Sequence, residues 1–268
     1  MLPKHHWQDM TTEDFARSAT KDWIAILPVA AIEQHGPHLP VATDRVINEG
    51  YLARMLELLP ESLPATVLPV QAIGKSNEHI SSPGTLTFSW ETLTRAWIEI
   101  GDSIARAGVR KLVIINSHGG NVPIIDIVAR ELRVKHDMLV VGTAWSRLGH
   151  PDGLYGSHDL RFGIHGGEME TSIVLALRPD LVKADKAKNF RSTQENFEQE
   201  FTHLRAHGPV QFGWKAQDLN VEGTVGDASL ADPAKGRASL DHGARRFIEL
   251  LRDVHAFDLT RLWVPDRR

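Results

Sequence analysis

Residues 23–44 read WIAILPVAAIEQHGPHLPVATD, and this stretch decides the fold. It begins with the apolar run of residues 23–30, which is rich in isoleucine, as strands buried on both faces of a parallel sheet are. It ends at Thr43 and Asp44, either of which could cap a helix over residues 45–59. A strand followed by a helix is one βα unit, the repeating element of a parallel α/β sheet.

Further strands and helices alternate along the rest of the chain. Short apolar runs predict three more strands, over residues 66–72, 111–116 and 138–145. Helical patterns cover residues 89–107 and 122–135, and a last helix has one apolar face made by Leu240, Ala244, Phe247, Leu251 and Val254. The alternation predicts βαβ units and a mostly parallel sheet.

The chain shows no internal repeat, low-complexity tract or linker, so we expect a single domain over residues 1–268. Residues 186–222 are polar and irregular, which suggests a surface excursion. With 42% hydrophobic and 24% charged residues, the composition is that of an ordinary globular protein. The net charge of −4 favours neither a nucleic acid nor a membrane surface as partner.

The absence of cysteine excludes disulfides and thiolate metal sites. Any metal ion must therefore be held by histidine, carboxylate or backbone oxygen. The N-terminus has no apolar stretch of signal-peptide length, and no segment approaches the roughly 20 apolar residues that span a bilayer. We therefore expect a cytoplasmic protein.

The histidines are grouped in loops that follow predicted strands. The chain has 14 histidines, and three of the loops read AIEQHGPHLPVATD, IGKSNEH and SHGGN. In an open parallel sheet such loops gather at the carboxyl edge, where ligands bind. Side chains that are distant in sequence are therefore predicted to be neighbours in space.

These loops offer a set of metal ligands. Glu33 and His35 are two residues apart, so in extended backbone both side chains point the same way. Asp44 arrives at a helix start, His118 follows a strand, and Glu168 lies three residues after His165. Two histidines and three carboxylates suit a pair of divalent ions.

Each of these residues also has a simpler interpretation when it is taken alone. A single histidine is more often a hydrogen-bonded loop residue than a ligand. Asp44 could be only a helix cap, and Glu168 only a first-turn acid that suits the helix dipole. Glu168 and Glu170 would lie about 200° apart on a helix, so both cannot face one ion pair. We assign Glu168 as the ligand and Glu170 as a supporting acid.

Four motifs together resemble the creatininase family: EQHGPHLPVATD, GKSNEHISSPGTLT, SHGGN and HGGEMETS, with a weaker echo in GTVGDASLADPAKG. The resemblance covers residues 20–178 and implies a Rossmann-like, three-layer α/β sandwich with a dinuclear site. It implies that Glu33 and His118 hold one ion, that His35 holds the other, and that Asp44 bridges them. The implied ions are zinc or manganese, with iron as an alternative.

One position departs from creatininase itself, in which a glutamate follows the ligating histidine by two residues. Here that position is Gly120. The chain in this respect resembles the other branch of the family, which includes the formylaminopyrimidine deformylase and the mycofactocin-peptide peptidase. We expect Glu168 to supply the missing carboxylate, and creatinine is not the expected substrate.

The expected chemistry is hydrolysis by a hydroxide that bridges the two ions. The resemblance implies that His165 donates a proton to the leaving group beside the ligand Glu168, so both are predicted catalytic residues. Ser76, Glu78 and Gly119 are predicted to line the substrate pocket. The alternative for Glu78 and its neighbour His79 is a solvated loop pair.

The leading function is hydrolysis of a cyclic amide, a formamide or a similar non-peptide C–N bond in a small molecule. Hydrolytic C–C ring opening of a carbocyclic diketone is one rival, a metal-assisted sugar isomerase or lyase is a second, and a non-catalytic metal-binding or regulatory protein is a third. Residues 145–164 form a long loop in which we expect substrate specificity to reside. The resemblance also implies a homo-oligomer, specifically a hexamer.

Overall fold

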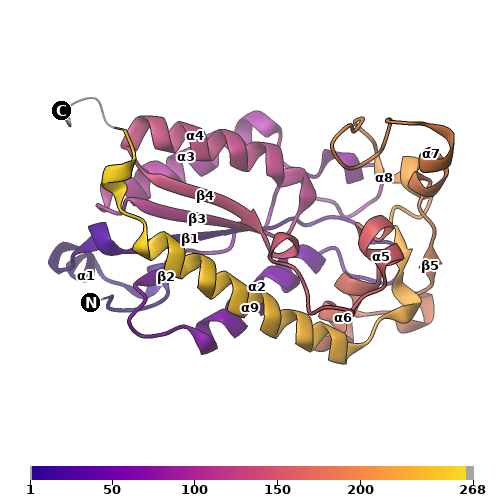
Figure 1. Cartoon of the computed structure of the whole chain (residues 1–268), viewed down its shortest axis with the longest axis horizontal. Helices are drawn as coiled ribbons and strands as arrows, with labels where there is room; N and C mark the ends of the chain where they lie inside the picture. The colour runs from indigo at the N-terminus through magenta and orange to yellow at the C-terminus, as the bar shows by residue number, and fades with distance from the viewer. Residues whose placement is uncertain (1, 264–268) are drawn as a thin grey trace.

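The computed structural model describes residues 2–263 and is built on a four-stranded parallel sheet with the strand order β2-β1-β3-β4 (Figure 1). The strands are β1 (Ile24–Val29), β2 (Ala65–Val67), β3 (Lys111–Asn116) and β4 (Leu139–Ala144). Every residue of β1 and β3 is buried, which agrees with their unbroken apolar sequences. The sequence therefore predicted the two central strands correctly.

The second strand is shorter than its apolar run suggests. The sequence predicted residues 66–72, but β2 pairs with β1 only over residues 65–67. Pro69 has no N–H to donate to a strand ladder, which disfavours further regular pairing at this edge strand. Beyond Pro69, the segment pairs with β1 again only at one isolated bridge, between Val29 and Gln71.

Helices cover both faces of the sheet, as Figure 1 shows. The nine described helices are α1 (Thr12–Arg17), α2 (Thr43–Leu58), α3 (Trp90–Arg106), α4 (Val122–His136), α5 (Ser157–Phe162), α6 (Glu168–Leu177), α7 (Gln194–Glu200), α8 (Ala216–Leu219) and α9 (Pro233–Ala256). Helices α3 and α4 pack on one face, and α2, α6 and α9 pack on the other.

Each face of the sheet has its own apolar core. One contains Trp23, Trp97 and Leu132 between the sheet and α3 and α4. The other contains the predicted apolar face of α9, all of whose five residues are buried. The chain is thus a three-layer α/β sandwich, as predicted.

Residues 186–222 are less irregular than the sequence suggests. They contain α7, α8 and the strand β5 (Asn189–Phe190), which pairs with β6 (Gly226–Asp227). A small apolar cluster of Ala206, Leu219 and Val225 lies beneath this segment. No helix within residues 2–263 combines the length and apolarity needed to cross a membrane.

Candidate metal centre

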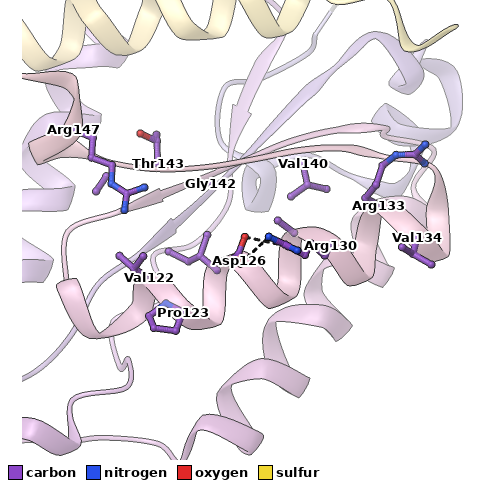
Figure 2. Close-up of a pocket in the computed structure, with 13 residues that line it drawn as sticks. Val122, Pro123, Asp126, Arg130, Arg133, Val134, Val140, Gly142, Thr143 and Arg147 are labelled. Atoms are coloured by element: carbon purple, nitrogen blue, oxygen red, sulfur yellow. Dashed lines mark hydrogen bonds and ion pairs between the residues drawn. The ribbon is translucent and has the colours of Figure 1, made fainter. Parts of the chain in front are cut away.

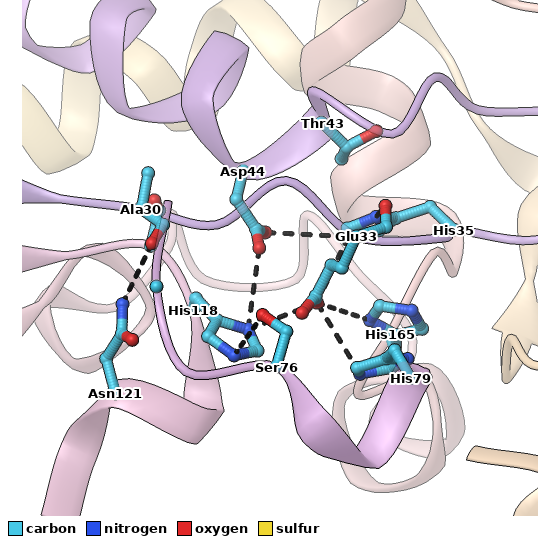
Figure 3. Close-up of polar contacts among 12 residues, drawn as sticks. Ala30, Glu33, His35, Thr43, Asp44, Ser76, His79, His118, Asn121 and His165 are labelled. Carbon is cyan, nitrogen blue, oxygen red and sulfur yellow. Dashed lines mark hydrogen bonds and ion pairs between the residues drawn. The ribbon is translucent and has the colours of Figure 1, made fainter. Parts of the chain in front are cut away.

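Four of the five predicted ligands meet at the carboxyl edge of the sheet (Figure 3). Glu33 and His35 lie in the loop after β1, Asp44 in the first turn of α2, and His118 just after β3. Their exposed fractions lie between 1% and 5%. The expectation that loops after different strands converge is therefore correct for these four side chains.

Asp44 lies between the two histidines. Its Oδ1 is 3.4 Å from Nε2 of His35, and its Oδ2 is 3.5 Å from Nδ1 of His118. The carboxylate does not cap α2, because the helix begins at Thr43 and its N-cap, Ala42, makes no side-chain capping bond. The prediction that Thr43 or Asp44 caps this helix is therefore wrong, and Asp44 faces the cluster instead.

Backbone carbonyls orient both imidazoles. Nδ1 of His35 is 3.0 Å from the carbonyl oxygen of Glu33, and Nε2 of His118 is 2.9 Å from that of Lys75. A carbonyl only accepts, so these nitrogens donate, and the other nitrogen of each ring has a lone pair. Those lone pairs face the carboxylates, with His118 Nδ1 3.1 Å from Glu33 Oε1. In metal sites, a hydrogen bond of this kind from one ring nitrogen fixes the other nitrogen as the ligand.

Several buried atoms of the cluster lack a hydrogen-bond partner: Glu33 Oε2, His35 Nε2 and Asp44 Oδ2. Glu33 and Asp44 form ion pairs only with histidines among the described residues. Buried polar atoms that lack a hydrogen-bond partner are costly. A divalent ion would satisfy these atoms at once, and the oxygen and nitrogen donors suit zinc or manganese.

The electrostatics of the cluster favour added positive charge. Burial by itself would lower the pKa of His35, but Asp44, Glu170 and Glu33 together raise it to about 9. Burial likewise opposes protonation of His118, whose pKa is nevertheless raised to about 10 by Glu33, Asp44 and Glu78. Carboxylates that stabilise protons on two buried imidazoles would also stabilise metal ions, which displace such protons on binding.

Glu168 lies outside this cluster, contrary to the prediction. Its carboxylate forms an ion pair with Lys235 of α9. Glu170 approaches the cluster instead, with Oε2 3.8 Å from Nε2 of His35. The same oxygen accepts a 2.6 Å hydrogen bond from the backbone N–H of Gly166. The structure therefore places Glu170, and not Glu168, beside the other predicted ligands.

Helix geometry explains the reversal. Helix α6 begins at Glu168, so the two carboxylates project about 200° apart, as the sequence implies. The rotation of α6 decides which of them faces inward. That rotation is set by packing against α9, in which Lys235 forms an ion pair with Glu168.

His165 also belongs to the cluster. Its Nε2 donates to the carbonyl oxygen of Gln34 at 2.8 Å, which leaves the Nδ1 lone pair 3.7 Å from Glu33 Oε1. Burial, with His35 and His79 nearby, holds the pKa of His165 well below its usual value, so the ring is neutral. Its backbone is fixed by Thr224 and Val225, in the segment that carries the weakest family motif.

Two residues that the sequence did not assign to the centre, Gln34 and His79, support it. The side-chain amide of Gln34 donates to Nδ1 of His79 at 2.7 Å, which leaves His79 Nε2–H directed at Glu33, 3.5 Å away. Gln34 also accepts a hydrogen bond from Gly36. The available signal was the position of Gln34 between two predicted ligands.

Two of the three predicted substrate contacts, Ser76 and Glu78, lie on the side of His118 away from the pocket. Ser76 is fully buried, with Oγ 3.2 Å from His118 Nε2, and Glu78 pairs with Lys75 at 3.1 Å. Neither lines the pocket, whereas Gly119 does. His79 is also buried, so the alternative of a solvated Glu78–His79 pair is wrong.

Gly120 is tightly enclosed. A Cβ atom at this position would collide with Glu78 Oε1, the carbonyl oxygen of Lys75 and the ring of His118. The space beside His118 that a longer side chain at position 120 would need is therefore taken by the loop after β2.

A pocket of about 450 Å³ opens over the cluster. Its floor includes His118 and Glu170, and one wall comes from residues 145–164, the predicted specificity loop. From that loop the wall uses Trp145, Ser146, Arg147, His150, Asp159, Leu160, Gly163 and Ile164.

The chain is similar in sequence to known proteins. The family model described as creatinine amidohydrolase matches residues 8–251. The chain is 34% identical over 195 residues to a creatinine amidohydrolase of Pseudomonas putida, across 66% of this chain and 74% of the relative. It is 33% identical over 232 residues to a mycofactocin precursor peptide peptidase of Mycobacterium tuberculosis, across 82% and 83%. A 3-dehydro-scyllo-inosose hydrolase of Thermotoga maritima is 23% identical over 267 residues, across 93% and 83%.

Solved structures show the same fold. A crystal structure of creatinine amidohydrolase superposes with a TM-score of 0.76 and 28% identity, covering 96% of this chain and 100% of that one. A structure named creatininase Mn gives 0.76 and 27%, covering 95% and 100%. A point mutant described as Zn-Zn type gives 0.75 and 27%, covering 95% and 99%.

Proposed function

We propose, from the premise that this chain belongs to the creatininase family, that it is an amidohydrolase which holds two divalent ions and cleaves a non-peptide C–N bond. The family match confirms the resemblance that the motifs predicted. Its substrate would be a small cyclic amide or formamide, and the pocket of about 450 Å³ suits a molecule of that size.

Asp44 is the residue that carries the proposal of two ions. Its two carboxylate oxygens face different histidines, His35 and His118, at 3.4 and 3.5 Å. Glu33 and His118 would hold one ion, His35 and Glu170 the other, and Asp44 would be shared. Creatininase structures described as zinc and manganese forms support these metals.

Bound divalent ions would activate a water molecule near neutral pH and polarise the substrate carbonyl. His165 would move the proton. Its Nδ1 lone pair faces the cluster, while the bond from Nε2 to Gln34 holds the ring in place. It can thus take a proton from the attacking water and pass it to the leaving nitrogen.

Two relatives favour other bonds. The mycofactocin precursor peptide peptidase favours a peptide C–N bond, and the 3-dehydro-scyllo-inosose hydrolase favours a different ring substrate. Mass spectrometry of the products would separate C–N from C–C cleavage, because amide hydrolysis leaves a new amino group, on the same molecule for a cyclic amide, whereas C–C cleavage does not. Oxygen from labelled water enters the product in either hydrolysis but not in an isomerisation.

Metal stoichiometry tests the proposed centre. The purified protein is expected to hold close to two divalent ions per chain by elemental analysis, and strong chelation is expected to abolish amide hydrolysis. Full activity in chelator, with no tightly held metal, would refute the proposal.

Three variants locate the ligands. Asp44→Ala removes the shared carboxylate, so metal content is expected to fall toward zero. Glu170→Gln removes a ligand of the His35 ion only, so about one ion is expected to remain. Glu168→Gln is the matched control on the same helix and is expected to retain two. If Glu168→Gln loses an ion while Glu170→Gln loses none, the assignment of Glu170 fails.

A further inference from the structure

A second hollow extends the metal-centre pocket along the edge of the sheet. It has a volume of about 780 Å³ and lies between α4 and the outer edge of β4 (Figure 2). In the described residues β4 pairs only with β3, so its other edge faces this groove. The two hollows share Val122, Ala144 and Arg147 in their walls, so they meet at these residues.

Arg147 is an unpaired cation at this junction. No hydrogen bond or ion pair engages its exposed guanidinium within residues 2–263. The other arginines of the groove are engaged: Arg130 pairs with Asp126 at 3.3 Å, and Arg133 with Asp137 at 2.9 Å. Figure 2 shows Arg147 on the segment after β4, reaching toward the side of the groove where Val122 lies.

The carboxylates of the metal-centre pocket do not compete for Arg147. Asp159 accepts backbone hydrogen bonds from Glu168 and Asp227 at 3.1 and 2.8 Å. Glu170 faces His35, as described above. Among the described residues that line this pocket, Arg147 is the one lysine or arginine. A negative charge on the substrate would therefore find its partner here.

We propose that Arg147 binds a carboxylate group of the substrate where the metal-centre pocket opens into the α4–β4 groove. The inference rests on the proposed function and narrows the substrate to amides that carry a carboxylate. One planar guanidinium offers two parallel N–H donors, which match the two oxygens of a carboxylate. The rest of a longer substrate would extend along β4.

Matched probes test this preference on the metal-loaded protein. One pair is pyroglutamate and pyrrolidinone, which are cyclic amides with and without a carboxylate. The other is N-formylglycine and N-formylglycinamide. Calorimetric titration is expected to show that the acid of at least one pair binds about 10- to 100-fold more tightly, the range for a charge-assisted hydrogen-bonded pair. Equal binding within both pairs would overturn the inference.

Variants separate Arg147 from the metal ions, which could also attract a carboxylate. Arg147→Gln is expected to abolish the preference, and Arg147→Lys to restore part of it. Arg130→Gln, in the same groove but already ion-paired, is expected to leave it intact. A preference that survives Arg147→Gln would place the carboxylate on the metals and refute the proposal.

Metal content and amide turnover, measured in parallel, keep the two proposals distinct. If the wild type holds its ions and hydrolyses neutral and acidic amides equally well, only the role of Arg147 fails. If it holds no metal, the proposed function fails, and the comparison of Arg147→Gln with wild type still measures carboxylate binding.

Discussion

At the scale of the residue, His165 tests the proposed division between metal ligands and a proton carrier. In the proposed centre, Glu33, His118, His35, Glu170 and the shared Asp44 would provide six ligand positions. His165 stands beside them, with Nδ1 3.7 Å from Glu33 Oε1. Its Nδ1 lone pair faces the cluster as those of His35 and His118 do. We assign it proton exchange with the reacting water molecule, because the other five residues would already hold both ions.

His165→Ala is accordingly expected to retain its metal ions and to lose turnover by about 10²- to 10⁴-fold, the usual contribution of a general acid or base. Elemental analysis and amide hydrolysis on the same preparation measure both effects. His158→Ala, on the exposed part of α5, serves as the control and should behave as wild type. Loss of an ion from His165→Ala would make His165 a ligand instead.

The sequence predicted that Glu33, His35, Asp44, His118 and His165 lie together, because each lies in a motif that follows a strand or begins a helix. It failed for Glu168, because the spacing of two glutamates gives their separation around a helix but not the rotation of that helix. Ser76 and Glu78 were misplaced for a similar reason. Whether a loop side chain lines a pocket or supports a ligand from behind depends on tertiary packing.

At the scale of the element, α6 is positioned by close contact with α9. Gly236 lies in α9, and a Cβ atom there would collide with the carbonyl oxygen and carbon of Ser172 in α6. Backbone atoms cannot move aside as a flexible side chain can. The two helices therefore approach closely because position 236 has no side chain, and this approach helps to hold Glu170 beside His35.

Gly236→Ala is expected to lower the free energy of unfolding by about 1–2 kcal/mol. Overpacking costs about 1–3 kcal/mol, and the higher helix propensity of alanine offsets up to about 1. Thermal denaturation of the metal-depleted protein measures the change. Gly156→Ala is the control, because nothing lies within 4 Å of a Cβ atom at that position. Equal stability of both variants would contradict the close-contact account.

Elements with a strong pattern were predicted well and those without one were not. The runs of β1 and β3 gave nearly correct boundaries, and all five residues of the predicted apolar face of α9 are buried. The shortened β2 could be anticipated only from Pro69, and the helices within residues 186–222 had no clear periodicity. Those helices are stabilised by a small cluster that brings together residues from Ala206 to Val225.

At the scale of the whole molecule, an exposed apolar segment supports self-association. Ile80, Leu86, Phe88 and Trp90 follow the loop after β2 and are between 42% and 59% exposed. Large side chains exposed so close together commonly mark an interface. We therefore retain the prediction of a homo-oligomer, with the hexamer resting on family resemblance.

Light scattering at micromolar concentration is expected to give a mass several times the 29.8 kDa of one chain. Trp90→Glu would place a charge in the interface and is expected to reduce that mass. Val221→Glu, at an isolated site that is 85% exposed, should not. A wild-type mass equal to one chain would contradict the prediction.

The enclosure of Gly120 limits which substitutions this position can accept. A glutamate here has no room while Glu78 and the Lys75 carbonyl stay where they are. Either change made first would produce an impaired intermediate: a steric clash, or a His118 that has lost a neighbouring carboxylate. We therefore expect positions 78 and 120 to be epistatic, with a larger residue tolerated at 120 only when the loop after β2 changes with the turn after β3.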